Sequence, residues 1–326
     1  MDEKIKIDAK DRKILFELEQ GCRRPLGQIA KVVGVSKQVL HYRIERLEKE
    51  GAIKWFLTGI NVAKLEYSDY EVWVQLEPMD GKKKETLLHD LEAHENVWAV
   101  ADCGGKFDLM VGIFAENIVQ FNRIWEGIVE SHPGCIKNRF FSISRELFAY
   151  PRAYLGGGEG GKGAFAISGE PKAVALDESE RKILWLLANN ARMQLVEMAD
   201  KAGVSVNTAR AKMKRMENEG IITGYKIQID HAKIGMENYE ILATLQNMNA
   251  KREKEIERYC EHNQYSSFLL KCIGKWDIDV GFDAKDSAHF QQILAEFRSK
   301  FAEVINEFEI VSIVRWRKFT YYPFGN

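Results

Sequence analysis

The sequence predicts an α+β chain that contains two copies of one unit, each a three-helix domain followed by a small domain of strands and helices. Two observations predict this fold. The chain matches itself when Asp8 is placed on Asp177, a shift of 169 residues. In both copies the apolar spacing changes from helical to alternating at the same point. A glycine-rich stretch separates the copies.

The repeat covers both domains of the unit. Near the chain ends the copies fall out of step by three residues, so that Tyr150-Pro151 corresponds to Tyr322-Pro323. A repeat of about 150 residues is too long for a solenoid, which indicates a dimer fused into one chain. The matched segments include Arg12-Lys13-Ile14-Leu15 with Arg181-Lys182-Ile183-Leu184, Gly34-Val35-Ser36 with Gly203-Val204-Ser205, and Gly105-Lys106 with Gly274-Lys275.

The composition indicates a globular protein. The chain has 326 residues, of which 45% are hydrophobic and 29% charged, and its net charge is −1. Any contact with nucleic acid must therefore come from local patches of charge. Five cysteines without a C-x-x-C spacing argue against a disulfide framework or a zinc site. The charged start and the lack of a long apolar stretch predict a cytoplasmic protein that makes no membrane contact.

The segment between the copies is expected to be a flexible linker over residues 152–173. Six of the nine residues 155–163 are glycine, a composition that does not hold a packed element. A phosphate-binding loop is the alternative for such a stretch. It requires Ser or Thr after Gly-Lys, whereas Gly161-Lys162 is followed by Gly163.

The first domain of each unit is predicted to be a helix-turn-helix. Residues 9–20 and 26–33 have helical apolar spacing, and Gly34 suits the end of the second helix. Ser36 suits the N-cap of a third helix that stops at Gly51. The second copy repeats this plan, so we expect these domains at residues 1–60 and 174–229.

The third helix of each copy is expected to enter the major groove of double-stranded DNA. With Leu40, Ile44 and Leu47 inward, its polar residues point outward or sideways. Amide and guanidinium groups near the start of such a helix can read base edges, and the other cations suit phosphates. The ordinary alternative, a charged surface helix, is disfavoured because both copies keep the Gly-Val-Ser turn. The predicted DNA contacts are Ser36, Lys37, Gln38, His41, Tyr42, Arg43 and Arg46, with Ser205, Asn207, Thr208, Arg210, Lys212, Lys214 and Arg215.

The second domain of each unit, at residues 61–151 and 230–326, is predicted to be ferredoxin-like. In the first copy the pattern gives a strand at 70–76, a helix at 82–94, strands at 97–103 and 107–114, a helix at 117–130 and a strand at 136–148. This order, β-α-β-β-α-β, defines the ferredoxin-like arrangement.

Each copy resembles the Lrp/AsnC family of feast/famine transcription regulators. The resemblance lies in Gly34-Val35-Ser36, the run from Arg43 to Gly51, residues 220–225, and the turns Gly105-x-x-Asp108 and Gly274-x-x-Asp277. It implies a winged helix-turn-helix followed by a ligand-sensing RAM-type domain, self-association through the ferredoxin-like domains, and modulation by an amino acid or similar small molecule. Members usually carry one unit per chain, so this chain is expected to act as a pseudo-dimer.

The resemblance also places an effector near the glycine-containing turns, at Gly105, Lys106, Asp108, Gly274, Lys275 and Asp277. An amino-acid ligand carries charges that Asp and backbone N–H groups can bind. The alternative is a plain turn in which Asp accepts local hydrogen bonds.

Two other functions stay open. The architecture also resembles the sirohaem decarboxylases, which pair two such units. We expect no enzyme, cofactor, metal or catalytic residue, because His89, His94 and His132 lack ligand-like spacing and no catalytic set can be read. The third possibility is a ligand sensor with reduced DNA binding, since Val206 and Ala211 lie in the second recognition helix.

Overall fold

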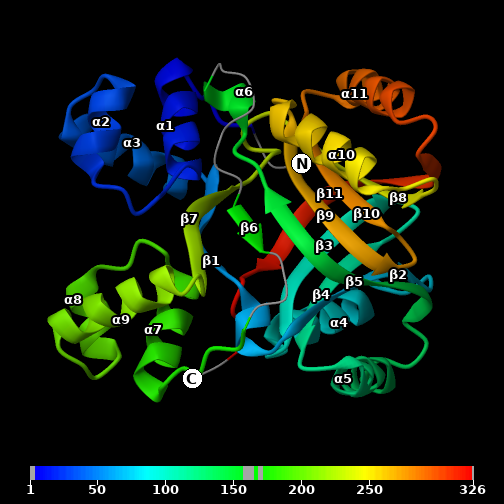
Figure 1. The fold of residues 1–326 in the computed structure, drawn as a ribbon, viewed down its shortest axis with the longest axis horizontal. Helices are drawn as coiled ribbons and strands as arrows, with labels where there is room; N and C mark the ends of the chain where they lie inside the picture. The colour runs from blue at the N-terminus through cyan, green and yellow to red at the C-terminus, as the bar shows by residue number, and fades with distance from the viewer. Residues whose placement is uncertain (1–3, 157–164, 168–171, 325–326) are drawn as a thin grey trace.

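Two helix-turn-helix units lie on one side of a barrel of β-strands (Figure 1). The computed structural model describes residues 4–156, 165–167 and 172–324. None of the helices in these ranges combines the length and apolar character needed to cross a membrane.

Each helix-turn-helix unit is built from three helices around an apolar core. They are α1 (Ala9–Glu19), α2 (Leu26–Val33) and α3 (Lys37–Lys49), and then α7 (Glu178–Asn189), α8 (Leu195–Lys201) and α9 (Val206–Asn218). Asp8 and Asp177 close capping boxes at α1 and α7. Gly34 ends α2 with a φ of +75°, which glycine adopts without strain. Leu40, Ile44 and Leu47 of α3 are buried, as predicted.

The wing strands join the two copies. β1 (Ile53–Ile60) and β7 (Ile222–Ile229) pair with each other in an antiparallel ribbon. The Thr58 hydroxyl of β1 donates a hydrogen bond to the Leu187 carbonyl of the second copy at 2.7 Å. In return, the Cys22 backbone N–H of the first copy donates to the Tyr225 carbonyl of β7 at 3.1 Å. Each wing strand therefore packs on the helices of the other unit.

The second domains have the predicted ferredoxin-like order of elements. A short 3₁₀ turn, η1 (Val62–Leu65), leads into the first of them. Its strands lie in the order β5-β2-β4-β3, and those of the second copy in the order β11-β8-β10-β9. The elements are β2 (Ser68–Leu76), α4 (Gly81–Ala93), β3 (Val97–Gly105), β4 (Leu109–Ala115), α5 (Ile118–Ser131) and β5 (Ile136–Ala149), then β8 (Glu237–Leu245), α10 (Ala250–His262), β9 (Ser266–Gly274), β10 (Ile278–Ala284), α11 (Ser287–Lys300) and β11 (Ile305–Phe319).

Two pairings between the copies close these sheets into one barrel. β3 pairs with β11, and β5 pairs with β9. Because β2 also pairs with β5, the eight strands form a closed ring without free edges. The helices α4, α5, α10 and α11 lie outside the barrel (Figure 1). The interior is therefore shared by both copies.

The prediction of a flexible linker over residues 152–173 is wrong for two parts of that range, 153–156 and 165–167. Residues Ala153–Gly156 form the short helix α6, and its Leu155 is buried against the core of the first helix-turn-helix unit. A Cβ at Gly156 would lie 2.7 Å from the Phe16 ring, so glycine allows this close packing. Residues Phe165–Ile167 form β6, which pairs with β5. The remaining parts of the predicted linker, 157–164 and 168–171, lie outside the described residues.

Candidate nucleic-acid interface

The N-terminal half of α3 presents exposed side chains to solvent. Lys37, Gln38, His41 and Tyr42 are all exposed, and the Tyr42 side chain is 67% accessible. His41 Nε2 lies 3.3 Å from the Glu45 carboxylate one turn further on. The predicted base-reading residues of the first copy are therefore accessible to a duplex.

The corresponding surface of α9 carries a different set of side chains. Asn207, Thr208, Arg210, Ala211 and Lys214 are exposed. Arg210 Nη1 donates to the Asn207 side-chain oxygen at 3.1 Å, so the two side chains lie side by side on the surface. The two recognition faces therefore differ in both charge and hydrogen-bonding groups.

The two serines among the predicted contacts act as helix caps. The Ser36 hydroxyl accepts from the Val39 N–H at 3.2 Å, and the Ser205 hydroxyl accepts from the Thr208 N–H at 3.1 Å. These bonds satisfy backbone donors that a helix start leaves free. Both serines remain exposed at the tip of the helix.

Arg43 and Arg46 have partners within the first helix-turn-helix unit. Arg43 Nη1 lies 2.8 Å from both Asp8 and Asp11, and Arg46 Nη2 lies 2.5 Å from Asp11. The Asp11 N–H and Arg43 hold the pKa of Asp8 down at about 2. Because the Asp11 carboxylate is buried, these arginines tie α3 to α1, and a contact with DNA would have to compete with that role.

The second copy repeats this arrangement. Lys212 forms an ion pair with Asp177, and Arg215 Nη1 lies 2.5 Å from the buried Glu180. Four of the predicted DNA contacts therefore lie on the side of the recognition helix that faces the unit's own first helix. The spacing of about 100° per residue places them sideways but does not reveal the acidic partner 35 residues earlier in the chain.

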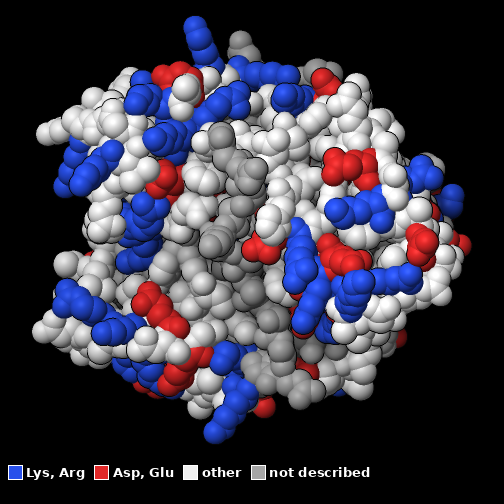
Figure 2. All heavy atoms as spheres, turned by 45° about the horizontal axis from the view of Figure 1, so that its top comes forward, with Lys and Arg blue, Asp and Glu red and all other residues white. Residues whose placement is uncertain are grey.

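Both recognition helices lie on the same side of the barrel, one in the upper and one in the lower lobe of Figure 1. Figure 2 shows basic and acidic side chains interspersed over one face, in keeping with the net charge of −1.

The predicted effector residues form two exposed turns, and the aspartate of each turn accepts a hydrogen bond from the backbone. Asp108 accepts a hydrogen bond from the Leu76 N–H at 2.8 Å, and Asp277 accepts one from the Leu245 N–H at 2.6 Å. Each aspartate thus satisfies the backbone at the end of the neighbouring strand, 32 residues earlier in the chain, so this bond is not the local one of a plain turn. Gly105 and Gly274 have φ values of +107° and +139° and are needed for the turn.

The two lysines of these turns also have partners. Lys106 forms an ion pair with Glu309 of the other copy. Lys275 Nζ lies 4.8 Å from the centre of the Trp276 ring, which is cation–π distance. The structure therefore brings each predicted effector set together in its own turn, at opposite seams of the barrel.

Sequence reasoning did not identify a buried ionic network at Arg152. This arginine lies 2.7 Å from Asp283 of β10 and 2.9 Å from Glu19 of α1. His231 Nε2 lies 3.0 Å from Asp283, and the Tyr154 hydroxyl donates to the same residue at 3.0 Å. The network connects the first helix-turn-helix unit to the second half of the barrel. Arg152 is 131 residues from Asp283 and 133 residues from Glu19 in the sequence, so no local motif reveals the network.

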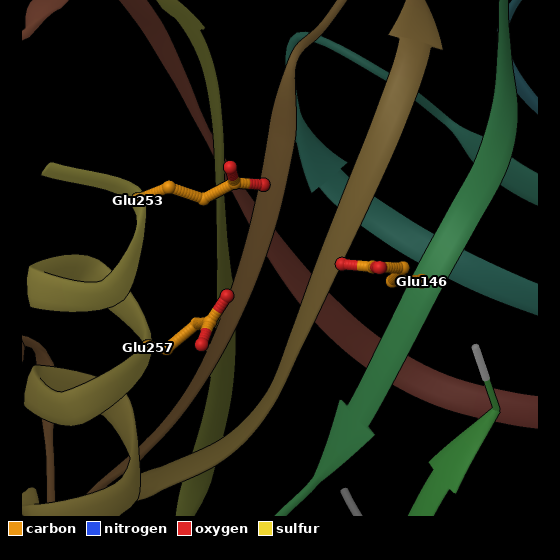
Figure 3. A group of neighbouring side chains, drawn as sticks. All are labelled: Glu146, Glu253 and Glu257. Carbon is orange, nitrogen blue, oxygen red and sulfur yellow. The ribbon is translucent and has the colours of Figure 1, made fainter. Parts of the chain in front are cut away.

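A second missed cluster consists of Glu146, Glu253 and Glu257, whose oxygens lie within 4.8 Å of one another (Figure 3). Such a group could hold a metal ion. In this structure the Lys271 ammonium lies between them, 2.6 Å from Glu146, 2.9 Å from Glu253 and 2.5 Å from Glu257. The lysine supplies the positive charge that the three carboxylates require.

Comparisons with known proteins agree with this geometry. A family model described as winged helix-turn-helix DNA-binding matches residues 7–54 and again residues 176–223. An uncharacterised HTH-type transcriptional regulator of Pyrococcus furiosus is 29% identical over 135 residues, which are 41% of this chain and 80% of that protein. The regulator FL11 of the same organism is 28% identical over 147 residues, 44% of this chain and 96% of FL11.

The chain is similar to HTH-type transcriptional regulators, and its two matched segments are winged helix-turn-helix DNA-binding domains. It carries one unit twice, each time a winged helix-turn-helix followed by a ferredoxin-like domain. The solved structure of the siroheme decarboxylase NirDL has the same overall fold, with a TM-score of 0.61 over 97% of this chain and 94% of that one. The identity of 13% shows a shared fold alone. The chain is thus a tandem fusion whose halves close a single barrel.

Proposed function

We propose that this chain is a cytoplasmic, sequence-specific regulator of transcription of the Lrp/AsnC type, in which one chain supplies both halves of a pseudo-dimer. The observation that carries the proposal is the pair of exposed recognition helices on one side of the barrel, held together by the β1–β7 ribbon. Half-sites on one face of DNA lie roughly 34 Å apart, one helical turn.

The exposed residues of the two helices support an asymmetric target. Gln38 and Asn207 can pair with adenine, and Arg210 with guanine. Tyr42 and Ala211 occupy equivalent positions but differ in size and polarity. We therefore expect an imperfect palindrome in which each copy prefers its own half-site.

Amino acids or similar small molecules are the proposed class of effector. The two glycine turns at Gly105 and Gly274 are exposed on the barrel surface, where a further chain could associate through the ferredoxin-like domains. Their aspartates already bond to backbone, so a ligand there would be held mainly by exposed backbone groups and by Lys106 or Lys275. In this proposal the turns lie at an interface between chains.

A gel-shift titration with a genomic fragment selected by footprinting tests the regulator. Affinity is expected to fall steeply with salt, because cations on the protein displace condensed counterions. Arg210→Ala should weaken binding by about 1–3 kcal/mol and relax the preference for one base position. Lys82→Ala, an exposed change on α4, is the matched control and should bind as the parent does. Equal binding by the parent and Arg210→Ala would restrict base reading to the first copy, as in a sensor with reduced DNA binding.

A decarboxylase of the NirDL kind is the second candidate, favoured by the fold match along nearly the whole chain. It predicts a characteristic absorbance when the protein is mixed with an iron tetrapyrrole. Tight, salt-dependent DNA binding without that spectral change supports the regulator instead.

A further inference from the structure

A small hollow lies inside the barrel, between the two copies. Its volume is about 70 Å³, room for a few waters or one small polar head group. The carboxylates of Asp69, Glu71, Glu240 and Asp279 line it, and so does the aromatic ring of Trp316. The two glutamates come from equivalent strands, β2 and β8, so both copies contribute to this hollow.

Several acceptors around the hollow lack a hydrogen-bond donor. Both oxygens of Glu240 and of Asp279, and one oxygen of Glu71, are buried and receive no hydrogen bond from an N–H or hydroxyl donor, although Glu240 and Asp279 lie at hydrogen-bond distance from each other and can share a proton. The Ser267 hydroxyl, on a side chain only 7% exposed, also lines the hollow without a partner. A buried carboxylate without a donor is costly. These groups therefore require protons, water or a ligand that carries N–H donors.

Both copies contain one of these buried glutamates. Glu71 corresponds to Glu240 at the repeat shift of 169, so each half places a buried glutamate at the same point. The second copy adds Asp279 where the first has Met110. Burial raises the pKa of Glu240 to about 8, and burial together with the neighbouring carboxylates raises the pKa of Glu71 and Asp279.

A second hollow lies beside the inner one. It has a volume of about 310 Å³, and His231, Asn238 and Trp316 line both hollows. The head group of a ligand would occupy the inner hollow. The head would meet carboxylates and aromatic rings, which also attract cations.

Arg152, which also lines the inner hollow, is bonded to Glu19 and Asp283. The four carboxylates are not among the groups of acids that lie close enough to share a metal ion in the described part of the chain. An organic cation would supply hydrogen-bond donors to these carboxyl groups together with positive charge.

We propose that the barrel interior binds the ammonium or guanidinium head group of a small organic cation, through Glu71, Glu240 and Asp279. An ammonium brings three donors and a guanidinium five. Because Glu71, Glu240 and Asp279 are not a group of three whose oxygens lie within 4.8 Å of one another, an ammonium would bond to two of them, and the wider guanidinium suits all three. Binding replaces protons held by the carboxylates with the charge of the ligand. The site is separate from the DNA-binding helices and from the glycine turns, and it does not depend on the regulator assignment.

Isothermal titration calorimetry on the full chain tests the site with n-butylammonium and n-butylguanidinium, against n-butanol as the neutral probe. We expect saturable binding of one cation per chain and none of n-butanol. Glu240→Gln and Asp279→Asn should weaken binding by about tenfold or more, since each removes a charged hydrogen-bond partner. Glu126→Gln, an exposed change on α5, should bind as the parent does.

Proton release provides a second measurement that does not depend on the variants folding. Titration of the parent in buffers of different ionisation enthalpy should show protons released when the cation binds. Absence of saturable binding, equal affinity of the parent and both variants, or binding of n-butanol as strong as that of the amine would each overturn the proposal.

Discussion

The guanidinium of Arg46 on α3 lies 2.5 Å from the carboxylate of Asp11 on α1. The second copy repeats this relationship between Arg215 and Glu180 at the same distance. In both units an arginine of the recognition helix thus neutralises a buried carboxylate of the first helix. The contact fixes the helix that is proposed to enter the groove, so it contributes to the shape of the DNA-binding surface.

Arg46→Ala is therefore expected to act mainly on stability. The change removes one charged hydrogen bond from Asp11, which keeps Arg43, and should lower the free energy of unfolding by about 1–3 kcal/mol. Denaturant unfolding measures this loss. At a temperature where the variant is folded, its DNA affinity should change less than that of Arg210→Ala. A larger loss of DNA affinity in Arg46→Ala than in Arg210→Ala would instead mean that Arg46 contacts the DNA phosphates directly.

Lys37 and Lys214 are exposed cations on the recognition helices and are expected to contact phosphates. Replacing either with Gln should reduce the slope of log affinity against log salt by about 1, because one fewer counterion is released. Binding should weaken alike on specific and unrelated DNA. Gel shifts at four or more salt concentrations give the slope. An unchanged slope would mean that the lysine does not contact a phosphate.

The local periodicity predicted much of this fold and little of its long-range chemistry. The inward positions Leu40, Ile44 and Leu47 and the order of strands and helices follow from spacing alone. The pairing of β1 with β7 does not, because either strand could have formed a hairpin within its own unit. The partners of Arg46 and Arg152 are 35 and more than 130 residues away, and nothing near them in the sequence marks the contact. Glu71 and Glu240 alternate with apolar residues in their strands, a pattern that is typical of side chains facing solvent. The structure instead places both glutamates inside the closed barrel, where they are buried.

Arg152→Phe is expected to destabilise the chain by about 3–5 kcal/mol, because it leaves Glu19 buried without its cation and leaves Asp283 with only His231 as a possible cation. At the equivalent positions the other half of the barrel has Phe324 and Phe114, whose ring centres lie 6.3 Å apart. The double variant Arg152→Phe/Asp283→Phe copies that aromatic pair and should recover part of the loss. Thermal unfolding of both variants checks this. A double variant less stable than the single one would show that Asp283 stabilises the fold without Arg152.

The stability of the chain should fall as the pH rises from about 5 to 8.5. Burial raises the pKa of Glu240 to about 8 and that of Asp69 to about 6, so over this range these two groups hold more protons in the folded state than in the unfolded state. Stability then decreases with increasing pH. Glu240→Gln removes one of these groups and should flatten the dependence. Urea unfolding at several pH values measures it, and an equally steep fall in the variant would assign the dependence to other groups.

Lys271→Ala tests whether the cluster in Figure 3 can exchange an ammonium for a metal ion. The change leaves Glu146, Glu253 and Glu257 within 4.8 Å of one another without their shared cation, although Arg145 still contacts Glu253. We expect a loss of about 3 kcal/mol, at the lower end for a broken ion pair because the carboxylates are half-buried. Millimolar Ca²⁺ should raise the Tm of the variant and leave that of the parent unchanged, since oxygen ligands suit this ion. Equal shifts in both proteins would mean that the ion binds elsewhere, and no shift in either would mean that the three carboxylates separate once the lysine is gone.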